Sequence, residues 1–161
     1  MALMEVSLSS SELLRGLQCL HGRDAKYISD GQRQMVETAS VGGGRHVFVG
    51  LQCGGGKSMA WLVPLSASKL AGKKRKRHVV IVPYKFLAEF HKKSADTIFA
   101  EKMTVNTVVL SHSQIMMSTL PACLCTDTEL PDLLIMGMDA ATTFLAQHEA
   151  SVRSWASDGL L

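Results

Sequence analysis

Three consecutive glycines followed by a lysine and a serine constrain the fold of this chain more than any other feature. They lie in the stretch VFVGLQCGGGKSMAWLVP, residues 47–64. Glycines 54–56 let the backbone curl so that successive N–H groups can face one anion. The β-branched and aromatic run at residues 46–51 predicts a strand before the curl, and we expect a helix over about residues 57–69 after it. A strand, a glycine turn and a helix start are typical, in this order, of loops that bind phosphate.

The loop departs at one position from the phosphate-loop pattern G-x-x-x-x-G-K-[ST]. Leu51 stands where the first glycine is expected, and Gly50 comes one residue early. This position lies at the end of the predicted strand, where the chain need not approach a phosphate closely. Lys57 can neutralise the β- and γ-phosphates of a nucleotide, and the Ser58 hydroxyl can ligate Mg²⁺. The alternative is a glycine-rich turn with an accidental Gly-Lys-Ser; we favour a phosphate loop.

Strands and helices alternate along the rest of the chain. Ser9 and Glu12 form a capping-box pattern before a predicted helix that ends near residue 21, and a second helix is expected over residues 30–40. After the loop helix we predict strands at 78–84, 105–112 and 131–138, helices at 86–100 and 113–120, a loop at 123–130, and one or two helices over 139–156. The run at 78–84 is continuously apolar, which is typical of a strand buried on both faces of a parallel sheet. The pattern predicts an α/β fold with a doubly wound, mainly parallel sheet.

Much of the excess positive charge lies in one run. The chain has a net charge of +3, and five consecutive basic residues stand between the loop helix and the next predicted strand: Lys73, Lys74, Arg75, Lys76 and Arg77. A solvated loop explains such a run, and a patch that contacts nucleic-acid phosphates or directs nuclear import is the alternative.

The cysteines, the N-terminus and the lengths of the apolar stretches indicate where the chain is located in the cell. The four cysteines have no C-x-x-C spacing, so we expect reduced thiols and no zinc site. The N-terminus lacks a secretory pattern, and no apolar stretch approaches the roughly 18 residues of a membrane span. We therefore expect a nuclear or otherwise intracellular chain without a membrane partner.

The glycine loop resembles motif I of superfamily-two helicases, and it looks most like the RecQ-type DNA helicases. These carry T-G-G-G-K-S, then an aromatic residue and a proline at the places of Trp61 and Pro64. Cys53 replaces the usual threonine. The resemblance implies a P-loop NTPase (RecA-like) three-layer sandwich that is incomplete in this chain, with ATP and Mg²⁺ as cofactors. The implied nucleotide-binding residues within the loop are Cys53, Gly54, Gly55, Gly56, Lys57 and Ser58, with Ser58 also facing the metal.

Upstream, YISDGQRQMVET resembles the family's segment of an aromatic residue followed by G-Q, supplied here by Tyr27, Gly31 and Gln32. In the family this glutamine contacts the adenine edge, so Gln32 would favour ATP. An amide can donate to and accept from that edge at once. Without the resemblance, a glutamine at a helix start would be taken for a solvent-exposed residue.

Downstream, HVVIVPYKFLAEFHKK resembles motif Ia, whose turn holds the DNA backbone. Tyr84, Lys85 and Phe86 replace the usual small-polar-leucine sequence, and we expect Lys85 to contact phosphate. PDLLIMGMDAATT stands where the family has a strand ending in threonine-proline-glutamate, and Asp139 keeps the carboxylate. Lys85, Asp139 and the basic residues 73–77 are thus the candidate nucleic-acid contacts.

The sequence lacks the acids that hydrolysis by this machinery requires. In these helicases an aspartate holds Mg²⁺ and a neighbouring glutamate orients water, in a D-E-x-H motif after a strand. No Asp-Glu pair occurs here, and Asp132 precedes its strand. We therefore expect no catalytic residue within the chain. Residues 27–161 are expected to be a partial helicase ATP-binding domain, truncated before the D-E-x-H strand, and residues 1–26 an N-terminal helical segment.

The resulting hypothesis is the ATP-binding part of an ATP-dependent DNA helicase. The complete protein would bind single-stranded or forked DNA and couple ATP hydrolysis to strand separation, whereas this chain, without the rest of the helicase core, would be inactive alone. Two alternatives remain open. One is a non-catalytic nucleic-acid-binding remnant of the same fold; the other is a different P-loop phosphotransferase, such as a small-molecule kinase.

Overall fold

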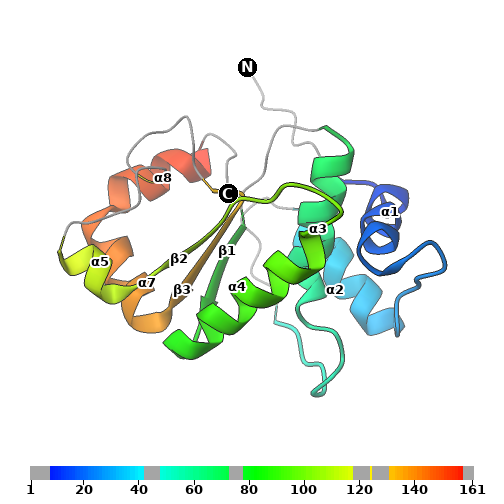
Figure 1. Cartoon of the computed structure of the whole chain (residues 1–161), viewed down its shortest axis with the longest axis horizontal. Helices are drawn as coiled ribbons and strands as arrows, with labels where there is room; N and C mark the ends of the chain where they lie inside the picture. The colour runs from blue at the N-terminus through cyan, green and yellow to red at the C-terminus, as the bar shows by residue number, and fades with distance from the viewer. Residues whose placement is uncertain (1–7, 42–47, 73–77, 118–123, 125–130, 158–161) are drawn as a thin grey trace. The chain divides into compact units, whose positions relative to one another are not determined.

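The computed structural model describes residues 8–41, 48–72, 78–117, 124 and 131–157. The chain forms two compact units, Met1–Arg75 and Lys76–Leu161 (Figure 1). No helix within the described residues is long and apolar enough to cross a membrane. The predicted boundary between an N-terminal helical segment and the ATP-binding domain, at residues 26 and 27, stays a prediction. Within the first unit α1 (Ser10–His21) packs on α3 (Met59–Leu70).

Helices make up the first unit. The predicted capping box starts α1: the Ser9 N–H donates to Glu12 Oε2 (2.7 Å), and the Glu12 N–H donates to Ser9 Oγ (3.3 Å). The second helix, α2 (Asp30–Val41), lies where the sequence predicts it. The loop helix α3 begins at Met59, two residues later than expected, because Lys57 and Ser58 form a turn that leads into it.

α1 and α3 approach each other backbone to backbone at Gly16. A Cβ on Gly16 would lie 2.8 Å from the Val63 carbonyl oxygen and 2.9 Å from the Ala67 nitrogen. The Ser66 hydroxyl donates to the Gly16 carbonyl oxygen across the same contact (3.2 Å). Only a residue without a side chain allows so close a crossing, so Gly16 sets the distance between the two helices.

The second unit is built on a parallel sheet in the order β1-β3-β2. Its strands are β1 (His78–Val82), β2 (Thr107–Leu110) and β3 (Leu133–Gly137). Leu133 is aligned with His78 on one side and with Thr107 on the other. The predicted parallel α/β sheet is thus confirmed. The helices of this unit are α4 (Lys85–Phe99), α5 (His112–Met116), α7 (Met138–Gln147) and α8 (Glu149–Ser157).

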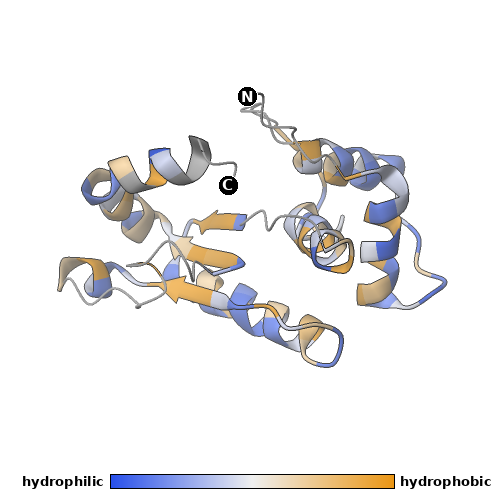
Figure 2. Ribbon diagram, turned by 90° about the horizontal axis from the view of Figure 1, so that it is seen from above, coloured by the Kyte–Doolittle hydropathy of each residue, from blue (hydrophilic) through white to orange (hydrophobic). Residues whose placement is uncertain are grey.

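The core of the second unit lies on both faces of β3. Leu134 and Met136 of β3 join a cluster with α5 and α7 that includes Phe144, whereas Leu133 and Ile135 point to the opposite face. α4 packs against all three strands and contributes buried Ala88, Ala95 and Phe99. In Figures 1 and 2 the apolar strands lie between α4 and the helices α5 and α7.

The predicted burial of β1 on both faces is wrong. Val79 and Ile81 are 40% and 44% exposed, because β1 is an edge strand of the described sheet and its side chains on that face remain uncovered. Continuous burial belongs instead to the central strand, β3. A continuously apolar run therefore identified the strands but not their order in the sheet.

The strand predicted before the glycine loop is also wrong within the described residues. Residues 48–51 form no strand, and Phe48 is 99% exposed; residues 46 and 47 lie outside the described part. A β-branched and aromatic run becomes a strand only when a neighbouring strand pairs with it. In the described chain the three strands pair only with one another.

The segment after β2 differs from its prediction as well. α5 ends at Met116, earlier than the predicted residue 120, and most of the predicted loop at 123–130 lies outside the described residues. Leu124 is described and is buried in the cluster with α5 and α7.

Candidate functional site

The glycine loop turns through two left-handed residues. Gly54 has φ +79° and Gly56 has φ +71°, values that other residues rarely adopt. Between them Gly55 is buried, and its N–H donates to the Gln52 carbonyl oxygen (3.0 Å). Cys53 lies exposed at the same turn. The glycine run therefore forms the curled backbone that the sequence predicts.

Lys57 follows the curl with its ammonium group turned back over the loop. Its Nζ donates to the carbonyl oxygens of Leu51 (3.0 Å) and Gln52 (2.9 Å). The side chain is exposed, so these contacts form at the surface. The positive charge thus lies against the carbonyl oxygens of the two residues that lead into the glycine turn, and its role toward a phosphate stays a prediction.

Ser58 is the cap residue of α3. It has helical dihedral angles, and its side chain makes no capping hydrogen bond. The first turn is closed by backbone bonds instead: the Met59 N–H donates to the Gly56 carbonyl and the Ala60 N–H to the Lys57 carbonyl, both at 3.0 Å. The helix start therefore does not depend on a hydrogen bond from the Ser58 hydroxyl, and the metal-ligating role of Ser58 stays a prediction.

Gln32 packs directly against the glycine loop. The residue is only 4% exposed, and its Oε1 accepts the Ile28 N–H (2.9 Å). A Cβ on Gly56 would overlap the Gln32 Nε2, so the amide occupies the space beside the glycine. The structure thus joins the two segments that the sequence linked only through a family resemblance.

A helix-capping signal places Gln32 there. The Ser29 hydroxyl accepts the Gln32 N–H (3.1 Å) at the start of α2, as in a capping box. The glutamine side chain reaches back to Ile28, one residue before the cap. The Ser-x-x-Gln spacing in the sequence could have predicted this capping contact but not the burial of Gln32, because the same spacing at Ser9 and Glu12 forms an exposed contact.

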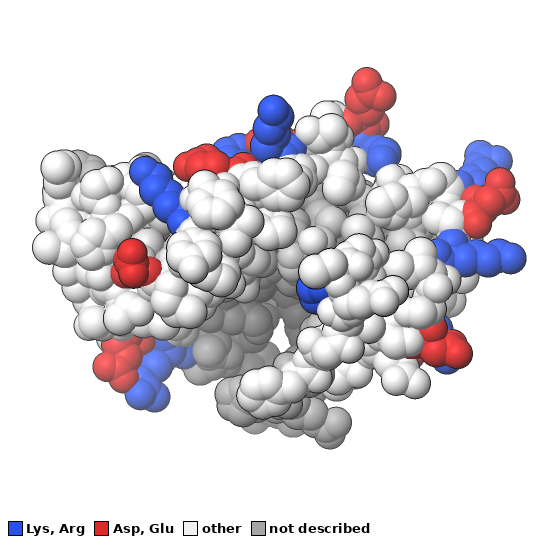
Figure 3. Space-filling view, turned by 90° about the horizontal axis from the view of Figure 1, so that it is seen from below, with Lys and Arg blue, Asp and Glu red and all other residues white. Residues whose placement is uncertain are grey.

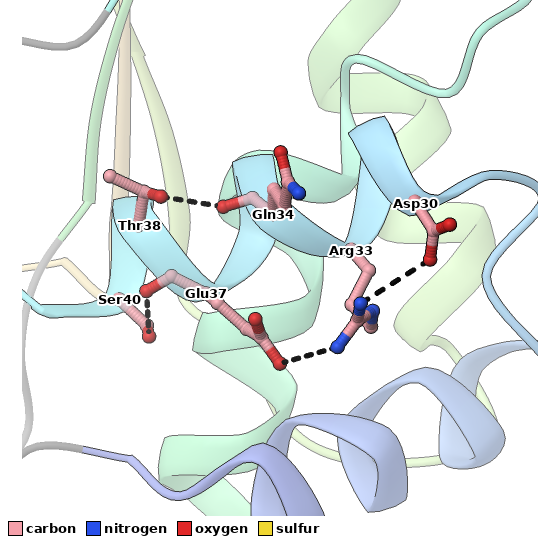
Figure 4. Close-up of polar contacts among 6 residues, drawn as sticks. All are labelled: Asp30, Arg33, Gln34, Glu37, Thr38 and Ser40. Carbon is pink, nitrogen blue, oxygen red and sulfur yellow. Dashed lines mark hydrogen bonds and ion pairs between the residues drawn. The ribbon is translucent and has the colours of Figure 1, made fainter.

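A cavity of about 560 Å³ lies beside this segment, between α1 and α2. It is lined by Ser10, Leu14, Lys26, Tyr27, Ser29, Asp30, Arg33 and Glu37. Within it Arg33 lies between two carboxylates, 3.3 Å from Asp30 and 4.0 Å from Glu37, as Figure 4 shows. No local pattern in the sequence indicates this cavity, because it arises from the packing of two helices.

The Tyr27 hydroxyl in this cavity is buried and has no hydrogen-bond partner among the described residues. Burial raises the pKa of the phenol above its usual value, and the Glu37 carboxylate raises it further, while Arg33 acts in the opposite direction. A buried hydroxyl without a partner costs folding free energy. Tyr27 thus presents a neutral donor beside the segment that holds Gln32.

The candidate nucleic-acid residues of the second unit follow the carboxyl ends of its strands. β1 leads through Tyr84 to Lys85, the first residue of α4, and β3 leads to Asp139 in the first turn of α7. A Cβ on Gly137 would lie 3.5 Å from the Lys85 nitrogen, so the two strand ends are closely packed. The carboxyl ends of parallel strands are the usual place for ligands in open α/β sheets.

Asp132 lies at the other end of the sheet, where the strands begin. Its buried carboxylate accepts the Asn106 N–H (2.8 Å), and its carbonyl oxygen accepts the His78 N–H (3.0 Å). The residue therefore ties the starts of the strands together. Its position before β3 is as predicted.

The basic residues 73–77 lie outside the described part of the chain. On the face drawn in Figure 3, lysine and arginine side chains are interspersed with aspartate and glutamate.

Together, the curled glycine loop leading into a helix and the open parallel α/β sheet define the RecA-like phosphate-loop class of proteins. The model of the DEAD/DEAH box helicase family matches residues 29–155, and the chain belongs to this family. Helicase domains of this family bind ATP, usually with Mg²⁺, and nucleic acid. No curated protein and no solved structure matches the chain.

Proposed function

We propose that this chain is the ATP-binding part of an ATP-dependent DNA helicase of the RecQ-like type. Lys57 neutralises the β- and γ-phosphates of ATP, Ser58 ligates Mg²⁺, and the backbone of residues 53–56 surrounds the phosphates. The observation that carries the proposal is the loop itself, which turns through left-handed Gly54 and Gly56 and presents Lys57 at the start of α3. The RecQ-like assignment rests on the motif with Trp61 and Pro64.

In this proposal Lys57 exchanges partners when nucleotide binds. Its ammonium group leaves the carbonyl oxygens of Leu51 and Gln52 for phosphate oxygens, which carry full charge and form stronger hydrogen bonds. The lysine therefore remains over the loop in both states, and only its acceptors change.

Gln32 has two tasks in the proposal. Its buried amide supports the shape of the loop through Gly56, and its remaining hydrogen-bonding capacity selects adenine. Replacing Gln32 should therefore weaken ATP binding and reduce the preference for ATP over GTP. If the variant loses affinity equally for ATP and GTP, Gln32 supports the loop but does not select adenine.

We propose that this chain binds ATP without appreciable turnover. The sequence contains no Asp-Glu pair to hold Mg²⁺ and orient water. Lys85 and Asp139 are proposed as contacts to DNA at the edge of the sheet. In this proposal the complete helicase core binds single-stranded or forked DNA and separates the strands.

The test is a titration of the chain with a fluorescent ATP analogue and Mg²⁺. Lys57→Ala should reduce affinity at least tenfold, because a hydrogen-bonded charge pair is worth roughly 1.5–3 kcal/mol. Lys93→Ala, which removes an exposed lysine from α4 of the second unit, is the matched control and should bind like the unmodified chain. Equal binding by the Lys57 and Lys93 variants would refute the proposal.

One observation favours the non-catalytic alternative. The Lys57 ammonium already has two backbone acceptors, so it is hydrogen-bonded within the loop without phosphate. A nucleic-acid-binding module that ignores nucleotide would bind DNA in a salt-dependent way and retain that binding in Lys57→Ala. Phosphoryl transfer to a small acceptor, without stimulation by DNA, would instead support the phosphotransferase alternative.

A further inference from the structure

Three aromatic rings are exposed together where β1 passes into α4. Tyr84 is 63%, Phe86 67% and Phe90 62% exposed. Phe86 and Phe90 are four residues apart and share one side of the helix. The Tyr84 and Phe86 rings stack, with centroids 5.7 Å apart and an angle of 8° between their planes. We call these three residues the aromatic platform.

The described core of the second unit does not use the platform. α4 packs on the sheet through other residues, namely Ala88, Ala95 and Phe99. Large exposed apolar side chains that gather at one place mark an interaction surface more often than isolated ones do. The sequence signal was the four-residue spacing of Phe86 and Phe90 on the side of α4 away from its buried alanines.

The charges around the platform are mixed. Lys85 lies between Tyr84 and Phe86 at the N-terminus of α4, whose first turn contains no acidic residue. Glu89 follows within the helix, and Asp139 comes two residues after Gly137, which packs against Lys85. Exposed Lys93 lies three residues after Phe90 on the same side of α4, so two lysines stand against two carboxylates, and together they make a weak site for a polyanion. Most of the binding at this surface must therefore come from the rings.

We infer that the aromatic platform stacks the unpaired bases of a single-stranded nucleic acid. Every base has a flat face that stacks on an aromatic ring, whatever the sequence. In a duplex these faces are covered by neighbouring base pairs, so the platform selects single strands. The inference rests on the proposed nucleic-acid function and deepens it, because it assigns contacts to bases in addition to the backbone contact proposed for Lys85.

The experiment measures fluorescence anisotropy of the 161-residue chain with a labelled 12-nucleotide oligo-dT, an abasic oligonucleotide of the same length and a blunt duplex. Phe86→Ala should weaken oligo-dT binding about tenfold and leave binding of the abasic strand unchanged. Phe86→Trp should restore the affinity. Met117→Ala, which also removes an exposed apolar side chain from the same unit, should have no effect.

The salt dependence separates stacking from charge. Phe86→Ala should leave the slope of log K against log salt unchanged, whereas Lys85→Ala should reduce that slope by about one. Because the rings are exposed, neither substitution should alter thermal unfolding followed by circular dichroism.

Three results would overturn the inference: no loss in Phe86→Ala, an equal loss on oligo-dT and on the abasic strand, or tighter binding of the duplex. Failure of the unmodified chain to bind oligo-dT would also overturn it. The nucleotide titration with Lys57→Ala is independent of the platform. It therefore shows whether only this inference fails or the proposed function fails with it.

Discussion

Replacement of Gly56 by alanine tests the contact between the glycine loop and Gln32. Alanine at Gly56 must keep the left-handed φ of +71°, which costs roughly 1–2 kcal/mol for a residue with a Cβ. Its Cβ would also overlap the Gln32 amide and displace it from the Ile28 N–H. Loss of that hydrogen bond adds about 1 kcal/mol. We expect Gly56→Ala to lower the free energy of unfolding by about 2–3 kcal/mol in all.

Substitutions at two other glycines separate the conformational cost of alanine from the cost of its contact with Gln32. Gly54 also has a positive φ, but a Cβ there would meet nothing within 4 Å, so Gly54→Ala should show the conformational cost alone. A Cβ on Gly50 would likewise meet no atom within 4 Å, and its φ is not in the left-handed range. Gly50→Ala should therefore change the free energy of unfolding by less than about 0.5 kcal/mol.

A double-mutant cycle isolates the contact itself. In Gln32→Ala the overlapping amide is absent, so adding Gly56→Ala should cost only the conformational part. The double variant should be about 1 kcal/mol more stable than the sum of the single effects predicts. Urea unfolding followed by Trp61 fluorescence, in a Trp155→Phe background, reports on α3 of this unit. Additive effects within about 0.3 kcal/mol would refute the contact.

Three further substitutions test packing and burial. Gly16→Ala should destabilise the chain by about 1–3 kcal/mol despite the higher helix propensity of alanine, because its Cβ would meet the backbone of α3. Arg15→Ala, at an exposed position of the same helix, is the control and should change the stability little. Equal urea midpoints for the two variants would contradict the close helix crossing. Tyr27→Phe should not destabilise the chain. Because burial keeps the Tyr27 phenol protonated in the folded state, while the unfolded chain releases its proton near pH 10, stability should fall as pH rises above about 10. Phenylalanine should remove that fall, and urea titrations between pH 8 and 11 would show whether it does. Asp132→Ala should cost about 1–3 kcal/mol through the unpaired Asn106 N–H, seen as a lower thermal midpoint; an unchanged midpoint would exclude this tie between strand starts.

Local signals predicted most of the helices and the glycine loop. The Ser9 capping box sets the start of α1 through contacts within four residues, and such contacts are legible in a sequence. Gly54 and Gly56 adopt the left-handed conformations for which glycine is suited. The sequence also predicted Lys57 and Ser58 at the start of a helix, although their roles with nucleotide stay predictions.

Features that depend on distant partners were not predictable. Phe48 belongs to a run of high strand propensity, yet it is exposed and unpaired with any described strand, because propensity cannot supply a neighbour. The cavity around Tyr27 needs the packing of α1 against α2. Gln32 was singled out only through a family resemblance, and its overlap with Gly56 could not be foreseen from spacing.

The order of strands in the sheet has a consequence for how the second unit assembles. Within the part of the chain that the structure describes, β1 and β2 do not pair with each other, and each pairs only with β3, the last of the three along the chain. During synthesis neither early strand has its partner until residues 133–137 have left the ribosome. The three described strands can therefore pair only after β3 has been made, and their pairing closes long stretches of chain, which slows folding. Until that step, the apolar segments of β1 and β2 are open to chaperones and to aggregation.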